Sequence, residues 1–169
     1  MQKEIINRVA NSKLITINLE DYYPEGKRSL FDIKDWLFEG LVLREKDFRQ
    51  KVKAHDWSQY RDNYISLTCS TDAIIPSWAY MLLTTYLTPF VKKVFVGNLE
   101  TLETSIYQDI ITNLDVSEYK DKPVIIKGCT NKPVPKNAYI LLTSKLMPVA
   151  KSIMFGEACS SVPLYKKSK

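Results

Sequence analysis

The sequence has little of what most catalytic and nucleotide-binding motifs require. It contains one histidine, three cysteines and five glycines in 169 residues. It has no G-x-S-x-G, Walker, G-x-G-x-x-G or H-E-x-x-H motif. Loops that cradle phosphate need glycine where the backbone approaches the ligand closely, so nucleotide binding is disfavoured. These absences point to no standard enzyme class, and whether the chain is an enzyme stays open.

No stretch of the sequence is both long and apolar. Residues 1–13, MQKEIINRVANSK, lack the apolar core of a signal peptide, and Pro76 interrupts the longest apolar run. A membrane-spanning helix needs about 20 apolar residues. The sequence therefore predicts a cytoplasmic protein that does not bind a membrane. In that reducing compartment, three cysteines are expected to be free thiols or metal ligands rather than disulfides.

The composition is that of an ordinary globular protein. The chain is 45% hydrophobic, and 24 basic against 19 acidic residues give a net charge of +5. A length of 169 residues predicts a single domain over residues 1–169 with a real core. The basic residues are spread along the sequence, whereas nucleic-acid binding demands a coherent basic stripe. Nucleic acid is therefore not an expected partner, and an unidentified protein partner stays open.

The sequence uses one pattern twice. Residues 64–97 and 124–156 align with an offset of 59, and ten of the 22 positions from Pro76 to Gly97 are identical in the second copy. Each copy reads as a strand, a loop, a helix opened by proline and a second strand closed by glycine. This predicts a duplicated βαβ unit.

The predicted elements alternate strand and helix along the chain. Strands are expected at 14–19, 64–69, 93–96, 124–127 and 152–155, and helices at 31–43, 44–60, 76–90, 99–114 and 135–148. Helical crossovers of this length join parallel strands. The predicted fold is a single three-layer α/β domain with a mainly parallel sheet.

The three cysteines each follow the end of a predicted strand. Cys69 and Cys129 occupy similar places in the two copies, and Cys159 lies in the loop GEACSSVP. In a single parallel sheet all carboxyl ends lie at one edge, where α/β proteins bind ligands. The sequence therefore predicts a metal site, with buried packing thiols as the alternative.

A tetrahedral zinc site needs a fourth ligand, and the only histidine is His55. Three cysteines and a histidine form a standard structural zinc set. Asp72 is a competing fourth ligand, and an iron–sulfur cluster is an alternative cofactor for the same thiols. A Cys69–His55 nucleophile pair is an enzymatic alternative, and a metal-free interaction module is a further one.

Three phrases carry a resemblance to a known family. AHDWSQY at 54–60, CSTDAIIPSWAYMLL at 69–83 and GEACSSVPLYKK at 156–167 resemble an uncharacterised domain-of-unknown-function family of small cytosolic Bacteroidetes proteins. The resemblance covers nearly the whole chain and implies no activity or ligand set. The phrases contain His55, Cys69 and Cys159, whereas Cys129 lies in a weaker match.

Overall fold

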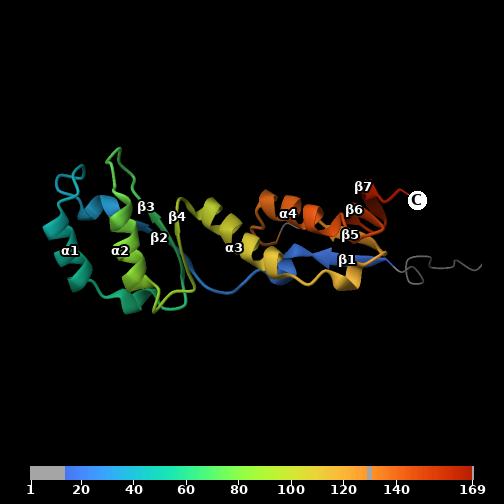
Figure 1. The fold of residues 1–169 in the computed structure, drawn as a ribbon, viewed down its shortest axis with the longest axis horizontal. Helices are drawn as coiled ribbons and strands as arrows, with labels where there is room; N and C mark the ends of the chain where they lie inside the picture. The colour runs from blue at the N-terminus through green and yellow to red at the C-terminus, as the bar shows by residue number, and fades with distance from the viewer. Residues whose placement is uncertain (1–13, 129–130, 169) are drawn as a thin grey trace, which may run out of the picture. The chain divides into compact units, whose positions relative to one another are not determined.

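The computed structural model describes residues 14–128 and 131–168, and the chain divides into two compact units (Figure 1). Unit 1 consists of Met1–Tyr23 and Tyr107–Lys169, and unit 2 of Pro24–Ile106. Each unit has its own sheet, with strand order β1-β5-β6-β7 in sheet A and β2-β3-β4 in sheet B. The predicted α/β class is confirmed, but the strands lie in two sheets instead of one. That the chain folds as one domain stays a prediction.

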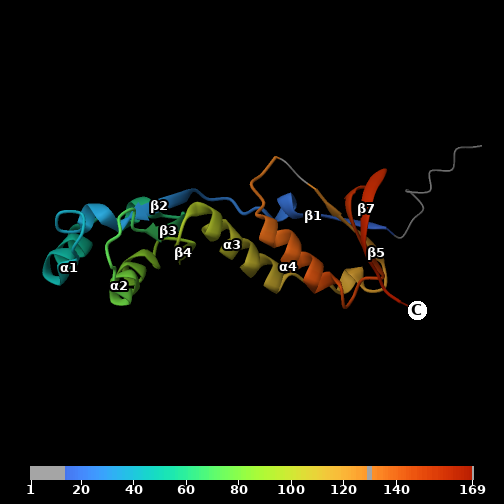
Figure 2. The same cartoon turned by 90° about the horizontal axis from the view of Figure 1, so that it is seen from above.

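Unit 2 packs two helices against one face of a parallel sheet. Its core joins Ile65 and Leu67 of the central strand to Phe48 and Val52 of one helix and Leu83 of the other. Both helices lie on the same side of sheet B in two perpendicular views (Figures 1 and 2). The elements are β2 (Arg28–Asp32), α1 (Glu45–Ala54), β3 (Tyr64–Thr68), α2 (Ser77–Leu87) and β4 (Lys93–Val96), and the three strands are parallel.

Unit 1 has the same plan with one added strand. Strands β1, β5 and β6 are parallel, and β7 pairs antiparallel with β6. Helix α3 begins in unit 2 and ends in unit 1, where its Tyr107 hydroxyl donates a 2.9 Å hydrogen bond to the Leu19 carbonyl. The elements are β1 (Ile15–Asn18), α3 (Leu99–Asn113), β5 (Pro123–Lys127), α4 (Lys136–Leu146), β6 (Ser152–Glu157) and β7 (Ser160–Lys166).

The predicted duplication is confirmed by strand register and burial. Tyr64 pairs with Lys93 in β3–β4, and Pro123 pairs with Ser152 in β5–β6, so both pairs shift by the same 59 residues. The helices shift equally, because fully buried side chains recur on both: Ala79, Leu83 and Leu87 on α2, and Ala138, Leu142 and Leu146 on α4. The apolar stripe of each helix therefore packs on its sheet in the same way.

The duplication extends upstream of the two βαβ units. Asp56 and Asp115 each accept a hydrogen bond from the backbone N–H two residues later, at 3.0 and 2.9 Å. Asp62 and Asp121 both have a positive φ, 62° and 56°. The segments that precede β3 and β5 thus share a hydrogen-bonded aspartate and a residue with positive φ at equivalent positions.

One predicted helix is wrong, and strands β2 and β7 were not predicted. Residues 31–43 do not form a helix, since β2 ends at Asp32 and a short 3₁₀ turn, Ile33–Trp36, precedes an irregular loop. Of the apolar side chains that suggested a helical stripe, Ile33 and Trp36 lie in the turn, and Leu37 and Leu41 lie in the loop that follows it. Strand β7 was not predicted, because Pro163 interrupts its alternation and Val162 and Leu164 are exposed. Among the described helices, none is long and apolar enough to cross a bilayer.

Candidate functional site

The residues predicted to bind zinc belong to both units. Cys69 directly follows β3 and His55 ends α1, both in unit 2, whereas Cys159 is an exposed thiol in the turn between β6 and β7 of unit 1. Cys129 lies outside the described residues. Over 14–128 and 131–168, no three His, Cys, Asp or Glu side chains gather closely enough to hold a metal ion. Zinc binding by this set stays a prediction.

His55 lies in an aromatic cluster of unit 2. Its Nε2 is 3.1 Å from the Tyr60 hydroxyl and 3.2 Å from Nε2 of Gln59. Its ring stacks on Tyr60 at 5.7 Å and meets the Trp57 ring edge-on at 4.6 Å. Burial lowers the pKa of His55, and the neighbouring Asp56 opposes this only partly. The imidazole is therefore neutral at pH 7, with aromatic and amide partners.

Two loops meet at the carboxyl edge of sheet B. One follows β2 over residues 37–44, and the other follows β3 over residues 69–76. The Thr71 hydroxyl joins them by donating a 3.0 Å hydrogen bond to the Gly40 carbonyl, and the Cys69 sulfur lies 3.4 Å from the same hydroxyl. Cys69 thus interacts with Thr71, and the hydrogen-bond partners of His55 are Tyr60 and Gln59. The predicted Cys69–His55 pair is not among these contacts.

The Asp32 carboxylate connects the ends of β2 and β3 at this edge. Asp32, the last residue of β2, accepts hydrogen bonds from the backbone N–H groups of Lys34 at 3.0 Å and Ser70 at 3.1 Å. Burial raises the pKa of Asp32, but hydrogen bonds from the Ser70 side chain and from both backbone groups outweigh it and leave the pKa lowered. The ionised carboxylate therefore joins the ends of β2 and β3 at neutral pH.

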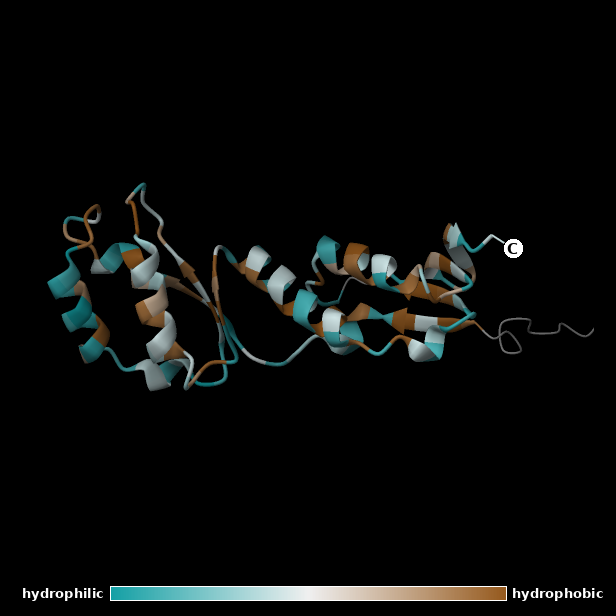
Figure 3. Ribbon diagram, viewed as in Figure 1, coloured by the Kyte–Doolittle hydropathy of each residue, from teal (hydrophilic) through white to brown (hydrophobic). Residues whose placement is uncertain are grey.

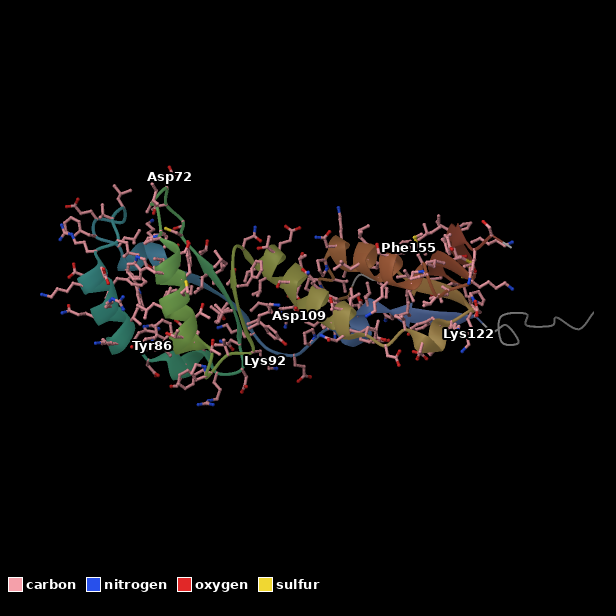
Figure 4. The ribbon with its side chains drawn as sticks, viewed as in Figure 1. Asp72, Tyr86, Lys92, Asp109, Lys122 and Phe155 are labelled. Atoms are coloured by element: carbon pink, nitrogen blue, oxygen red, sulfur yellow. The ribbon has the colours of Figure 1, made fainter. Side chains whose placement is uncertain are left out.

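Between the two loops lies an open groove of about 650 Å³. Its exposed apolar side chains are Ile74, 91% exposed, Leu41, 60% exposed, and Val42, 54% exposed. Figure 3 shows hydrophobic segments in both loops, and Figure 4 shows Asp72 at the tip of the second one. The groove is lined by Leu41, Val42, Leu43, Asp72, Ala73, Ile74 and Pro76, and Asp72 is the one ionisable residue of this set.

The corresponding loop of unit 1 differs in sequence from the loop that lines the groove. The offset of 59 places Pro133 where unit 2 has Ile74, and Asn131 where it has Asp72. Glu20 covers this loop, because its Oε1 accepts hydrogen bonds from the backbone N–H groups of Asn131 at 2.7 Å and Lys132 at 3.0 Å. The two units share their scaffold and differ in the loops at its carboxyl edge, which is where functional differences between copies of a fold usually lie.

Sequence reasoning missed the groove because it assigned residues 31–43 to a helix. The signal was present in LVL at 41–43 and AII at 73–75, two apolar triplets within segments bounded by glycine or proline. Loops are usually polar, so apolar triplets in two consecutive connections of a parallel sheet indicate a binding surface.

A family model described as a protein of unknown function, DUF2480, matches residues 3–167. No curated protein and no solved structure matches the chain.

Proposed function

The chain belongs to the DUF2480 family, and we propose that it is a protein-interaction module whose unit 2 binds an apolar segment of a partner protein in the groove at the carboxyl edge of sheet B. The observation that carries this proposal is the exposure of Ile74, at 91%, beside exposed Leu41 and Val42. Contiguous exposed apolar side chains of this kind mark interaction sites in folded proteins.

The shape of the groove favours a macromolecular partner over a small molecule. Small-molecule sites enclose most of the ligand surface. Here Ile74 is 91% exposed at the side of an open groove, so a partner segment that binds in the groove can cover it. Interfaces are organised around such central apolar side chains, which a partner desolvates completely.

The charge of the groove defines the chemistry of the partner segment. Asp72 is the single ionisable side chain among the lining residues. A carboxylate beside an apolar surface complements a lysine or arginine next to apolar side chains, and charge complementarity of this kind sets specificity and association rate. The expected partner segment therefore carries aliphatic residues and an adjacent cation.

Site-specific photo-crosslinking in cells that naturally produce the chain tests this function. A photoreactive residue at Ile74 or Val42 should crosslink a discrete partner, and the crosslinked peptide should contain aliphatic residues beside a lysine or arginine. The matched control is Ile140, a 64% exposed isoleucine on α4 of unit 1. The same crosslinked proteins at positions 74 and 140 would refute the proposal.

Affinity for the purified partner then measures the contribution of each side chain. Burying an isoleucine fully is worth about 1.5–3 kcal/mol, so Ile74→Ser should weaken binding roughly tenfold to a hundredfold. Asp72→Lys should weaken binding further through repulsion, and its effect should shrink at high salt. Neither change should lower the melting temperature, because both side chains are at the surface. Unchanged affinity in both variants would contradict the groove as the binding site.

Metal binding is a second candidate function, in which Cys159 is a ligand of zinc or of an iron–sulfur cluster. Two observations support it. The Cys159 thiol is exposed, and the ion pair between Lys127 Nζ and Glu157 Oε1, at 3.6 Å, joins the ends of β5 and β6 two residues before Cys129 and Cys159. Metal content by mass spectrometry tests it: Cys159→Ser should lower bound zinc or iron well below that of the unmutated chain. Equal metal content in the two proteins would contradict it.

A further inference from the structure

The strands of sheet A bring together lysines that are far apart in the sequence. Lys151 N donates a 2.9 Å hydrogen bond to the Lys122 carbonyl, and Lys167 N donates a 2.9 Å hydrogen bond to the Lys151 carbonyl. These three residues flank the adjacent strands β5, β6 and β7 at one edge of the sheet. We call Lys122, Lys151 and Lys167 the lysine row, and Figure 4 shows Lys122 beside β5.

The geometry of the row is regular. Neighbouring strands lie about 4.8 Å apart, so the three backbones stand at even intervals over roughly 10 Å. Lys151 and Lys167 are exposed and Lys122 is half-buried, and exposed Lys120 and Lys166 flank the row. Five cations from three segments of the chain therefore lie along one edge of unit 1.

The acidic side chains at this edge do not neutralise it. Asp121 Oδ1 lies 3.4 Å from Lys167 Nζ, but the two side chains are 64% and 52% exposed, and such surface pairs are weak. Glu118 hydrogen-bonds to Tyr119, one residue later. Among the residues that the structure describes around the row, two carboxylates thus accompany five ammonium groups.

The whole net charge of the chain belongs to unit 1. Unit 1 contains 13 basic and eight acidic residues, whereas unit 2 contains 11 of each. The lysine row is therefore part of a basic unit joined to a neutral one. The sequence did not show this, because the lysines are dispersed along it and only the pairing of β5, β6 and β7 aligns them.

We propose that the lysine row binds the phosphate backbone of duplex nucleic acid without sequence specificity. Lysine is depleted at protein–protein interfaces, which argues against a protein partner at this edge. Lysine is a standard neutraliser of backbone phosphates. No exposed aromatic ring flanks the row within the described residues, since Tyr119 is buried and Tyr165 half-buried. Because single-strand binders stack bases on such rings, duplex is the favoured form.

Fluorescence anisotropy of the full chain with a labelled DNA duplex of mixed sequence tests this inference. Each phosphate contact contributes about −0.9 to the slope of log K against log salt. Three to five contacts predict a slope of roughly −2.7 to −4.5, with little dependence on the duplex sequence. A slope near zero, or no binding at low salt, would overturn the proposal.

Two triple variants that each remove three positive charges distinguish binding by the lysine row from general attraction by the net charge. Lys122→Gln/Lys151→Gln/Lys167→Gln should make the slope less negative by about one per lysine. The control removes the same charge from unit 2 at exposed Lys34, Lys46 and Lys53, and should leave the slope nearly unchanged. Equal losses in the two triple variants would show attraction by net charge alone and would refute the row.

Two further measurements distinguish duplex binding from misfolding and from attraction to any polyanion. Arginine at the same three row positions should restore binding, which a loss of folding would not allow. Polyglutamate and vesicles of anionic lipid serve as competitors in the same assay. Displacement of the duplex by either one at an equal concentration of negative charge would assign the edge to acidic protein or to membrane, and would overturn the nucleic-acid proposal.

Discussion

Replacing Glu103 with glutamine tests the ion pair that stabilises the packing of α3 on sheet B within unit 2. Arg28 Nε lies 2.8 Å from Glu103 Oε2, and Arg28 Nη2 lies 2.9 Å from Oε1, so the pair is bidentate. The side chains are only 11% and 8% exposed. Glutamine preserves the shape of the side chain and removes its charge, so the buried guanidinium loses its attraction to the Glu103 carboxylate.

The expected cost follows from this geometry. Removing one partner of a buried ion pair typically costs about 3–5 kcal/mol. The lower end applies here, because Arg28 also donates hydrogen bonds to the carbonyls of Pro24 at 2.7 Å and Gly26 at 2.6 Å, and its guanidinium lies 4.8 Å from the centre of the Tyr64 ring. These contacts persist in Glu103→Gln. A loss of about 3 kcal/mol corresponds to a melting temperature lower by roughly 6–12 °C for a chain of this size.

Urea unfolding followed by circular dichroism measures the effect in a double-mutant cycle. Arg28→Met should also destabilise strongly, whereas Arg28→Met/Glu103→Leu should recover most of the loss, because neither charge of the pair is then buried without the other. The exposed pair Arg49–Glu45, with side chains 49% and 63% exposed, is the control, and Glu45→Gln should cost less than about 0.5 kcal/mol. If Glu103→Gln costs as little as Glu45→Gln, the reasoning fails.

Three further predictions concern stability. Burial lowers the pKa of His55, so the unfolded chain binds a proton at this residue more readily than the folded chain does. The free energy of unfolding should therefore fall as the pH drops below about 6.5. Urea titrations of His55→Gln should show a smaller fall in this free energy over the same pH range. Leu83→Ala and Leu142→Ala remove equivalent buried side chains and should each cost about 2–5 kcal/mol; a negligible loss in either would contradict the duplicated core. Gly156→Ala should cost roughly 1–3 kcal/mol by thermal melting, because φ is +118° and the added Cβ would lie 2.7 Å from the Ser160 carbonyl oxygen; an unchanged melting temperature would contradict that strain.

The sequence by itself determined the local elements of the duplicated part. The strands at 64–68 and 123–127 and the helices at 77–87 and 136–146 lie within two residues of their predicted bounds, apart from the C-terminal end of the first helix. Local patterns suffice there, because proline precedes each helix, glycine lies at or near the end of each following strand, and Ala79, Leu83 and Leu87 recur at helical spacing. The same patterns predicted that each copy is a parallel βαβ unit, which is confirmed.

Only the tertiary structure decided which strands pair. Strand β1 pairs with β5, more than a hundred residues away, while β2 pairs with β3. No local pattern distinguishes these partners, because a short alternating strand fits any parallel neighbour of matching polarity. That choice separates the chain into two sheets, places Cys69 and Cys159 at the edges of different sheets, and aligns Lys122, Lys151 and Lys167. The two loops that form the groove also depend on a contact between distant residues. The Thr71 hydroxyl in the second loop bonds to the Gly40 carbonyl in the first, 31 positions earlier in the sequence.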